Sequence, residues 1–124
     1  MEARERNVLY YKTISGKLPF SEWRNNLSDD DTKATIDARV ARMRGGNFGC
    51  SAPIGDGASE NKIDFGPGFR IYYAIAGDKI LLLCGGDKST QEADIRTAKE
   101  NWRDYKQREK ERRESVMRKA KKKK

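Results

Sequence analysis

Histidine is absent from this chain of 124 residues, and cysteine occurs only at positions 50 and 84. Without histidine the chain cannot assemble a Cys/His zinc site, and Ser89 has no imidazole to activate it as a nucleophile. Two cysteines do not make a disulfide framework. These absences argue against zinc-binding proteins, serine hydrolases and disulfide scaffolds. We expect no metal and no cofactor, and we expect Cys84 to be a buried core residue.

Long apolar runs are missing as well. The longest, Ile80 to Cys84, suits a buried strand and is far shorter than the roughly 20 residues of a membrane-spanning helix. The first six residues carry charges of both signs and lead into no signal-type apolar segment. The sequence therefore predicts a cytoplasmic protein without a membrane partner.

Net positive charge is absent from the body of the chain and concentrated at its end. Residues 1–102 contain 15 Lys and Arg against 15 Asp and Glu, whereas residues 103–124 contain 12 against 4. The whole net charge of +8 thus lies in the C-terminal segment, where it could attract phosphate backbones by releasing their counterions. A solvated extension that aids solubility is the alternative. The candidate RNA-binding residues there are Lys119, Lys121, Lys122, Lys123 and Lys124.

The length allows one domain with a modest core. We place that domain at residues 1–105 and a basic tail, flexible or helical, at 106–124, because ten residues without an apolar side chain follow Tyr105. Apolar spacing predicts helices over 19–27 and from the aspartates at 29–31 to Gly45, which together form a helical hairpin. A further helix should open after Ser89, which with Glu92 has the form of a capping box.

Strands are predicted over 8–13, 60–65, 70–75 and 79–84, with a short edge strand near Cys50 to Ile54. The run 79–84 is apolar on both faces, which is typical of a central strand. Gly66-Pro67-Gly68 and Gly77-Asp78 supply the turns. The predicted class is α+β: a twisted antiparallel sheet with the hairpin on one face and a C-terminal helix.

Basic side chains alternate along this strand meander. Lys62, Arg70 and Tyr72 should share the face opposite the hairpin, and Lys88 follows the last strand. Cations gathered on an uncovered face favour an anion between them, and a phosphate is the obvious one. An ordinary solvated face with cross-strand pairs is the alternative reading of the same pattern.

If the anion is the scissile phosphate of RNA, each residue has a role. Arg70 can bind two nonbridging oxygens, and Lys62 or Lys88 can act as a general acid or neutralise the leaving oxygen. Glu60 is the more natural base for the ribose 2′-hydroxyl, since lysine would need its pKa lowered by roughly three units. Tyr72 could stack on a base or transfer a proton.

Several motifs carry a resemblance to a known family. They are Gly-Asn-Phe-Gly at 46–49, Gly-Asp-Gly at 55–57, Asp-Phe-Gly-Pro-Gly-Phe-Arg-Ile-Tyr-Tyr at 64–73, Leu-Cys-Gly-Gly-Asp-Lys-Ser-Thr-Gln at 83–91 and Asp-Ile-Arg-Thr-Ala at 94–98. Over residues 8–103 the chain resembles the RelE/HigB-type toxins, and more narrowly the addiction module killer proteins among them.

The resemblance implies a RelE-like fold and the toxin of a type II toxin-antitoxin system. Such toxins cleave mRNA, often in the ribosomal A site, by attack of the 2′-hydroxyl without a metal, and so inhibit translation. The implied partners are mRNA, the ribosome and a cognate helix-turn-helix antitoxin, with operator DNA reached only through the antitoxin complex. Many relatives use a histidine near the C-terminus, which this chain lacks. A degenerate toxin-like module that binds RNA or an antitoxin without cleavage is the alternative.

Overall fold

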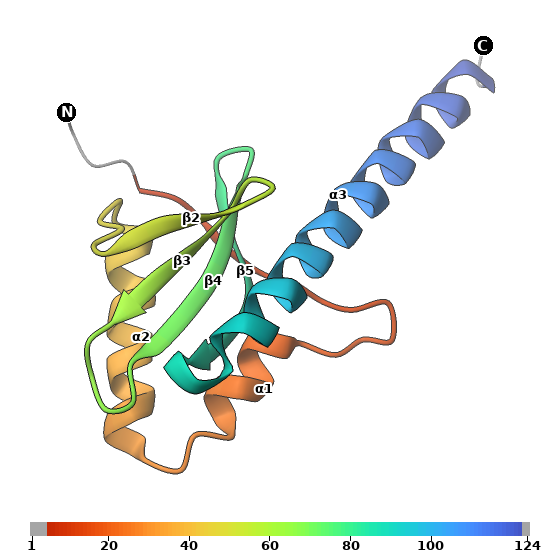
Figure 1. The fold of residues 1–124 in the computed structure, drawn as a ribbon. Helices are drawn as coiled ribbons and strands as arrows, with labels where there is room; N and C mark the ends of the chain where they lie inside the picture. The colour runs from red at the N-terminus through yellow and green to blue at the C-terminus, as the bar shows by residue number, and fades with distance from the viewer. Residues whose placement is uncertain (1–4, 123–124) are drawn as a thin grey trace.

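The computed structural model describes residues 5–122, which form a five-stranded sheet between two helical layers (Figure 1). This confirms the predicted α+β class. The elements are, in chain order, β1 (Val8–Tyr10), α1 (Pro19–Asn25), α2 (Asp30–Arg44), β2 (Ser51–Gly55), β3 (Ala58–Ile63), β4 (Phe69–Ala76), β5 (Lys79–Asp87), the 3-10 turn η1 (Lys88–Thr90) and α3 (Gln91–Lys122).

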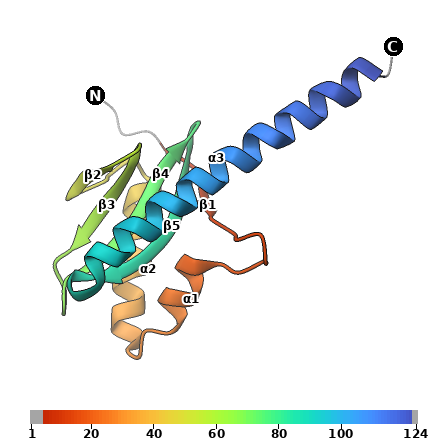
Figure 2. The same cartoon turned by 45° about the vertical axis from the view of Figure 1, so that its right-hand side comes forward.

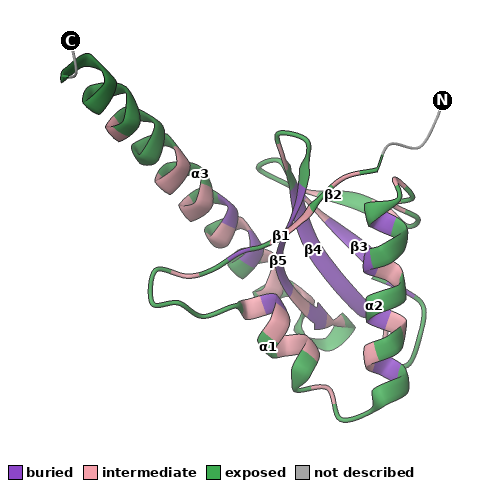
Figure 3. Ribbon diagram, turned by 180° about the vertical axis from the view of Figure 1, so that it is seen from behind, coloured by how far each residue is buried: buried purple, intermediate pink, exposed green. Residues whose placement is uncertain are grey.

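The helical hairpin α1/α2 covers one face of the sheet (Figure 3). Pro19 occupies the first turn of α1, where its missing N–H removes no helical hydrogen bond. Asp29 caps α2 by accepting a hydrogen bond from the backbone N–H of Asp31, as the run of aspartates predicts. Phe20 of α1 and Ile36 of α2 are buried against the side chains of β4 and β5 that point toward the hairpin. Hydrophobic burial therefore fixes the hairpin on this face.

The opposite face of the sheet is covered by the first half of α3 (Figures 1 and 2). Ala98 and Trp102 are buried against Tyr72, Ala74 and Leu83 of the sheet. The prediction that this face is uncovered is therefore wrong along the centre of the sheet. The reason is that Ile95, Ala98 and Trp102 recur at helical spacing and need an apolar surface to cover them.

The sheet order is β1-β5-β4-β3-β2, and its four later strands pair antiparallel. The first strand departs from the predicted antiparallel sheet, because β1 pairs with β5 in parallel. It is also shorter than predicted: after Tyr11 the chain turns away, and the backbone N–H of Thr13 bonds to the carbonyl of Lys17. With partners on both sides, β5 lies inside the sheet, as its apolar composition predicts.

The start of α3 differs from the predicted capping box at Ser89. Asp87 is the cap: its carboxylate accepts from the backbone N–H of Ser89, and its own backbone N–H donates to the hydroxyl of Thr90. The helix then continues far beyond the sheet (Figure 2). Hydrogen bonds from its side chains to the rest of the protein extend to Arg108, which donates to the backbone carbonyl of Lys12. The basic segment is thus helical through Lys122.

Candidate functional site

A cavity of about 370 Å³ lies at the end of the sheet where β3 turns into β4. It is lined by four cationic side chains, Arg39, Lys62, Arg70 and Lys88. Three of them, Lys62, Arg70 and Lys88, were selected from the sequence pattern, so their predicted proximity is confirmed. Four positive side chains around one hollow form a surface that favours an anion.

Strand register and a turn bring these cations together. Lys62 of β3 lies directly opposite Arg70 of β4, so both side chains emerge on the same face. The Gly66-Pro67-Gly68 turn joins the two strands, and Gly68 has a positive φ of 80° that suits glycine. An added Cβ at Gly68 would lie 3.7 Å from the Cβ of Lys88, which places η1 beside this turn.

Glu60 lies behind the cations, on the same strand as Lys62. Its carboxylate is 3.6 Å from Nε of Arg70 and 3.9 Å from Nζ of Lys62, and it accepts a 3.1 Å hydrogen bond from Nε2 of Gln91. Only 6% of Glu60 is exposed. A buried carboxylate needs such partners, and in return it orients the guanidinium of Arg70.

Arg70 is a buried cation that its neighbours hold in place. The residue is 8% exposed, its Nη1 donates to the carbonyl of Gly68, and its Nε has no hydrogen-bond partner within residues 5–122. That nitrogen faces the Glu60 carboxylate at 3.6 Å and is itself buried, so it pairs with Glu60 and is closed to a ligand. Arg70 is consequently held in place by Glu60 and Gly68 at the wall of the cavity.

Tyr72 does not line the cavity. It is fully buried beneath α3, and its hydroxyl has no hydrogen-bond partner among the described residues. Burial raises the pKa of Tyr72, and the nearby carboxylate of Glu60 adds to the effect. The prediction that Tyr72 is placed to stack on a base or transfer a proton is wrong, because α3 removes it from solvent.

Three cavity residues were missed from the sequence. Arg39 comes from α2 and donates to the side chain of Asn61 and the carbonyl of Lys62. Cys50, which precedes β2, and Asp64, which follows β3, also line the cavity. Asp64 is exposed and adds a second carboxylate to the site. Arg39 lies on another element, so only the tertiary structure shows that it lines the cavity. Asp64 is the next residue after Lys62 on the same face of the alternating pattern, so the sequence could have identified it.

The predicted RNA-binding lysines of the tail are not part of this cavity. Lys119, Lys121 and Lys122 lie exposed in the last turns of α3, which project away from the sheet (Figure 1). Lys123 and Lys124 lie outside the described residues. Any contribution of the tail to ligand binding is therefore separate from the cavity.

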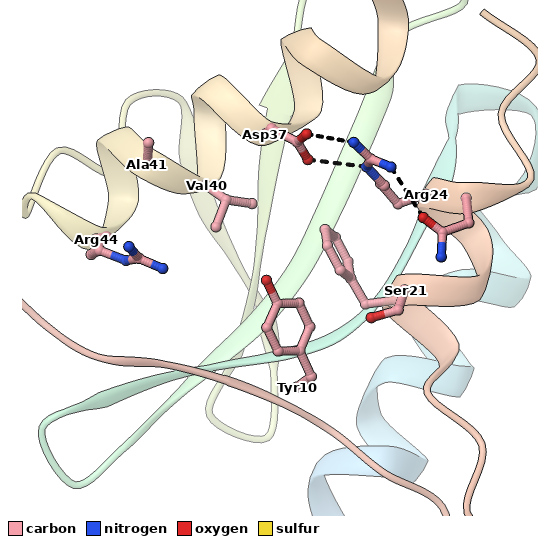
Figure 4. A pocket seen from close by; sticks show the side chains of 9 residues that line it. Tyr10, Ser21, Arg24, Asp37, Val40, Ala41 and Arg44 are labelled. Carbon is pink, nitrogen blue, oxygen red and sulfur yellow. Dashed lines mark hydrogen bonds and ion pairs between the residues drawn. The ribbon is translucent and has the colours of Figure 1, made fainter. Parts of the chain in front are cut away.

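A second hollow, of about 390 Å³, lies between α1 and α2 beside β1 (Figure 4). Its main charges compensate each other: Arg24 forms two hydrogen bonds with the carboxylate of Asp37, the shorter of 2.5 Å. Tyr10 and Arg44 complete the polar part of the lining. Because Arg24 is paired with Asp37, fewer cationic side chains are available to a ligand in this hollow than in the cavity at Arg70.

Two kinds of site are not found within residues 5–122. No group of three or more cysteine or carboxylate side chains is placed to hold a metal ion. No helix in this part of the chain is long and apolar enough to cross a membrane.

Comparison with known proteins gives one informative match. The chain is 45% identical over 87 residues to a Haemophilus influenzae protein described as uncharacterized, and the match covers 69% of this chain and 88% of that protein. No family model matches the chain, and no solved structure matches it. At this identity and coverage, the chain belongs to the same family as the Haemophilus influenzae protein.

Proposed function

We propose that this protein is a RelE/HigB-type toxin of a type II toxin-antitoxin system, acting as an endoribonuclease that cleaves mRNA on the ribosome and inhibits translation. The observation that carries the proposal is the cavity at the β3–β4 turn. Four cationic side chains line it, and one of them, Arg70, is buried and held against the carboxylate of Glu60. The motif resemblance over residues 8–103 supports the choice of RNA phosphate as the anion.

The proposed reaction is attack of a ribose 2′-oxygen on the adjacent phosphorus, with departure of the 5′-oxygen. Arg70 binds the nonbridging oxygens and stabilises the charge that accumulates on them in the transition state. Lys62 and Lys88 are exposed at the rim, where either can donate a proton to the leaving oxygen or neutralise it. Neither role needs a metal or an organic cofactor.

Two carboxylates compete for the role of general base. Glu60 was chosen from the sequence, but its carboxylate is buried and shared by Arg70, Lys62 and Gln91. Asp64 lines the cavity and is exposed. The variants Glu60→Gln and Asp64→Asn distinguish the two carboxylates. If the replaced carboxylate is the general base, the cleavage rate no longer rises with pH. If it only orients other groups, cleavage is weaker at every pH.

The proposed partners follow from the same family resemblance. They are mRNA, the ribosome and a cognate antitoxin, which we expect to be a helix-turn-helix protein that carries the toxin to operator DNA. We place the protein in the cytoplasm, where its proposed substrate is. A small helix-turn-helix reading frame next to this gene would support the assignment.

The test is induction of the chain without an antitoxin. We expect growth arrest and shortened messages with the natural sequence, and a loss of about 10²–10³-fold in cleavage rate with Arg70→Ala. Arg70→Lys keeps a cation beside Glu60, so it does not leave a buried carboxylate unpaired. It lacks the guanidinium group that can bind two oxygens at once, so its cleavage should also be impaired. Arg42→Ala, which removes an exposed arginine from α2, is the matched control.

The alternative is a toxin-like module that binds RNA or an antitoxin without cleaving. The absence of histidine and the burial of Tyr72 favour it, since both remove groups suited to proton transfer. Intact messages and normal growth on induction of a folded protein would establish this alternative. Equal toxicity of the natural protein and a folded Arg70→Lys protein would instead refute Arg70 as the central residue.

A further inference from the structure

A groove separate from the cavity lies between the β4–β5 turn and the middle of α3. Its volume is about 620 Å³, and its walls include Ile75 and Lys79 on the sheet side and Trp102 and Tyr105 on the helix. Arg70 and Ala76 lie at opposite ends of β4, so the groove and the cavity are about 20 Å apart along the strand. A ligand in one does not fill the other.

The groove carries an excess of positive charge. Five cationic residues line it, with Asp78 and Glu109 as the two acidic ones. They are Lys79, Lys106, Lys110, Arg112 and Arg113. Arg112 pairs with Glu109 at 3.0 Å, whereas the other four make no ion pair with the described residues 5–122.

The cations come from two separate elements and converge. Lys79 of β5 and Arg113 of α3 both line the groove. Both charges also lower the pKa of Glu109, although its hydrogen bond with Arg112 lowers it most. A cluster built from a strand and a helix is a feature of the tertiary structure, absent from any single sequence segment.

Aromatic rings form the floor of the groove. Trp102 and Tyr105 stack with ring centroids 5.9 Å apart and an angle of 14° between planes, and Nζ of Lys106 lies 5.0 Å from the Trp102 centroid. Trp102 is mostly buried, but Tyr105 is half-buried and offers a partly open ring. Rings beside unpaired cations are typical of grooves for single-stranded nucleic acid, because bases stack while the cations contact phosphates.

The groove continues along the projecting half of α3. Lys106, Lys110 and Arg113 follow one another at helical spacing, and Lys121 lies about two turns beyond Arg113, with Met117 between them on the same side of the helix. From Lys106 to Lys121 this stripe is about 22 Å long. Because the second half of α3 extends away from the sheet, nothing in residues 5–122 covers the stripe (Figure 2).

We infer that this groove is a binding site for single-stranded RNA, distinct from the cavity at Arg70, and that it holds a part of the strand remote from the cleaved phosphate. The inference relies on the proposed function for its choice of RNA. The binding itself can be measured whether or not the protein cleaves.

The experiment measures binding of the full chain to a labelled, unstructured 20-nucleotide RNA by fluorescence anisotropy at several salt concentrations. The groove variant is Lys79→Gln/Lys110→Gln/Arg113→Gln, and the matched control is Lys17→Gln/Lys33→Gln/Arg42→Gln. Both remove three positive charges, and all six side chains lack an ion pair within the described residues. Circular dichroism confirms that each variant is folded.

The groove variant should bind RNA at least about tenfold more weakly at moderate salt, with its salt slope reduced by about 2, whereas the control should change less than about twofold. Equal weakening in both variants would overturn the inference, because it would show a response to net charge alone. Unchanged binding in the groove variant would overturn it as well. So would groove-dependent binding of polyglutamate in place of RNA, since the groove would then fit an acidic polypeptide.

Cleavage of ribosome-bound mRNA, measured beside binding of the free 20-nucleotide RNA, separates this inference from the proposed function. The cavity at Arg70 is intact in the groove variant, so this variant should bind free RNA weakly but still cleave ribosome-bound mRNA when the protein is saturating. Arg70→Lys should do the reverse and lose cleavage while keeping groove binding. A protein that binds through the groove but never cleaves would overturn the proposed function and leave the groove inference standing.

Discussion

At the scale of single residues, burial decides what a charged or polar side chain can do. Arg70 and Tyr72 lie two positions apart on the same face of β4, and both are more than nine-tenths buried. Arg70 is oriented by Glu60 at the edge of a cavity, whereas Tyr72 lies under α3 with no partner for its hydroxyl among residues 5–122. The same alternation therefore places one residue in the site and the other in the core.

Tyr72→Phe tests this distinction. Removing a buried hydroxyl that lacks a partner should leave the free energy of unfolding unchanged or raise it by about 1 kcal/mol, because the unsatisfied group costs about 1–3 kcal/mol to bury. RNA cleavage should be unaffected. Urea unfolding and a cleavage assay measure the two effects. A large loss of cleavage in a folded Tyr72→Phe protein would return Tyr72 to the site.

At the scale of elements, α3 is attached to the body by a polar cluster as well as by Trp102. The hydroxyl of Tyr11 donates to the carboxylate of Asp104 at 2.5 Å, and Arg108 pairs with the same carboxylate at 2.6 Å. Arg108 also lies over the ring of Tyr11. This cluster joins the segment after β1 to a helix more than ninety residues later in the chain.

The cluster should make stability depend on pH in the acidic range. The hydrogen bond from Tyr11 and the pairing with Arg108 lower the pKa of Asp104 below its ordinary value of about 3.9. Its contribution is therefore complete above that value and is lost as the pH falls through the lower folded-state pKa. Asp104→Asn should be less stable at pH 7 and should converge with the natural protein in strong acid.

Urea unfolding across the acidic range measures this difference. Asp78→Asn, which changes an exposed carboxylate in the β4–β5 turn, is the control and should follow the natural protein at each pH. A constant difference between Asp104→Asn and the natural protein at every pH would show that the carboxylate charge does not attach α3.

At the scale of the whole molecule, charge is separated from the folded body. The first 102 residues are neutral in total, and most of the excess lies on α3 where it leaves the sheet (Figure 1). Ion pairs at i,i+3 and i,i+4, such as Glu109 with Arg112, support the helix where it no longer packs on the sheet. A long cationic helix on a neutral body is suited to contacting phosphates beyond the cavity.

Truncation after residue 114 tests the tail at this scale. It removes six Lys and Arg, but within residues 5–122 no side chain that it removes bonds to the body, because the side-chain hydrogen bonds from α3 to the rest of the protein end at Arg108. The midpoint of thermal unfolding should stay the same, while RNA and ribosome binding weaken and become less dependent on salt. Unchanged binding at low and moderate salt would show that the tail is only a solvated extension.

The local elements could be predicted from the sequence because they depend on nearby residues. The aspartates before α2, the apolar stripe of Ile36, Val40 and Met43, and the doubly apolar β5 act through caps and periodicity. The proximity of Lys62 and Arg70 also followed, since a short turn sets the register of a hairpin.

Only the tertiary structure decided which side chains remain accessible. Periodicity places Tyr72 and Arg70 on one face of β4, but whether α3 crosses that face depends on contacts between residues far apart in the chain. The same long-range packing brings Arg39 from α2 to the cavity and Lys79 to the groove beside Arg113. Sequence patterns define faces locally, whereas burial is a property of the assembled layers, and it is burial that separates the site from the core.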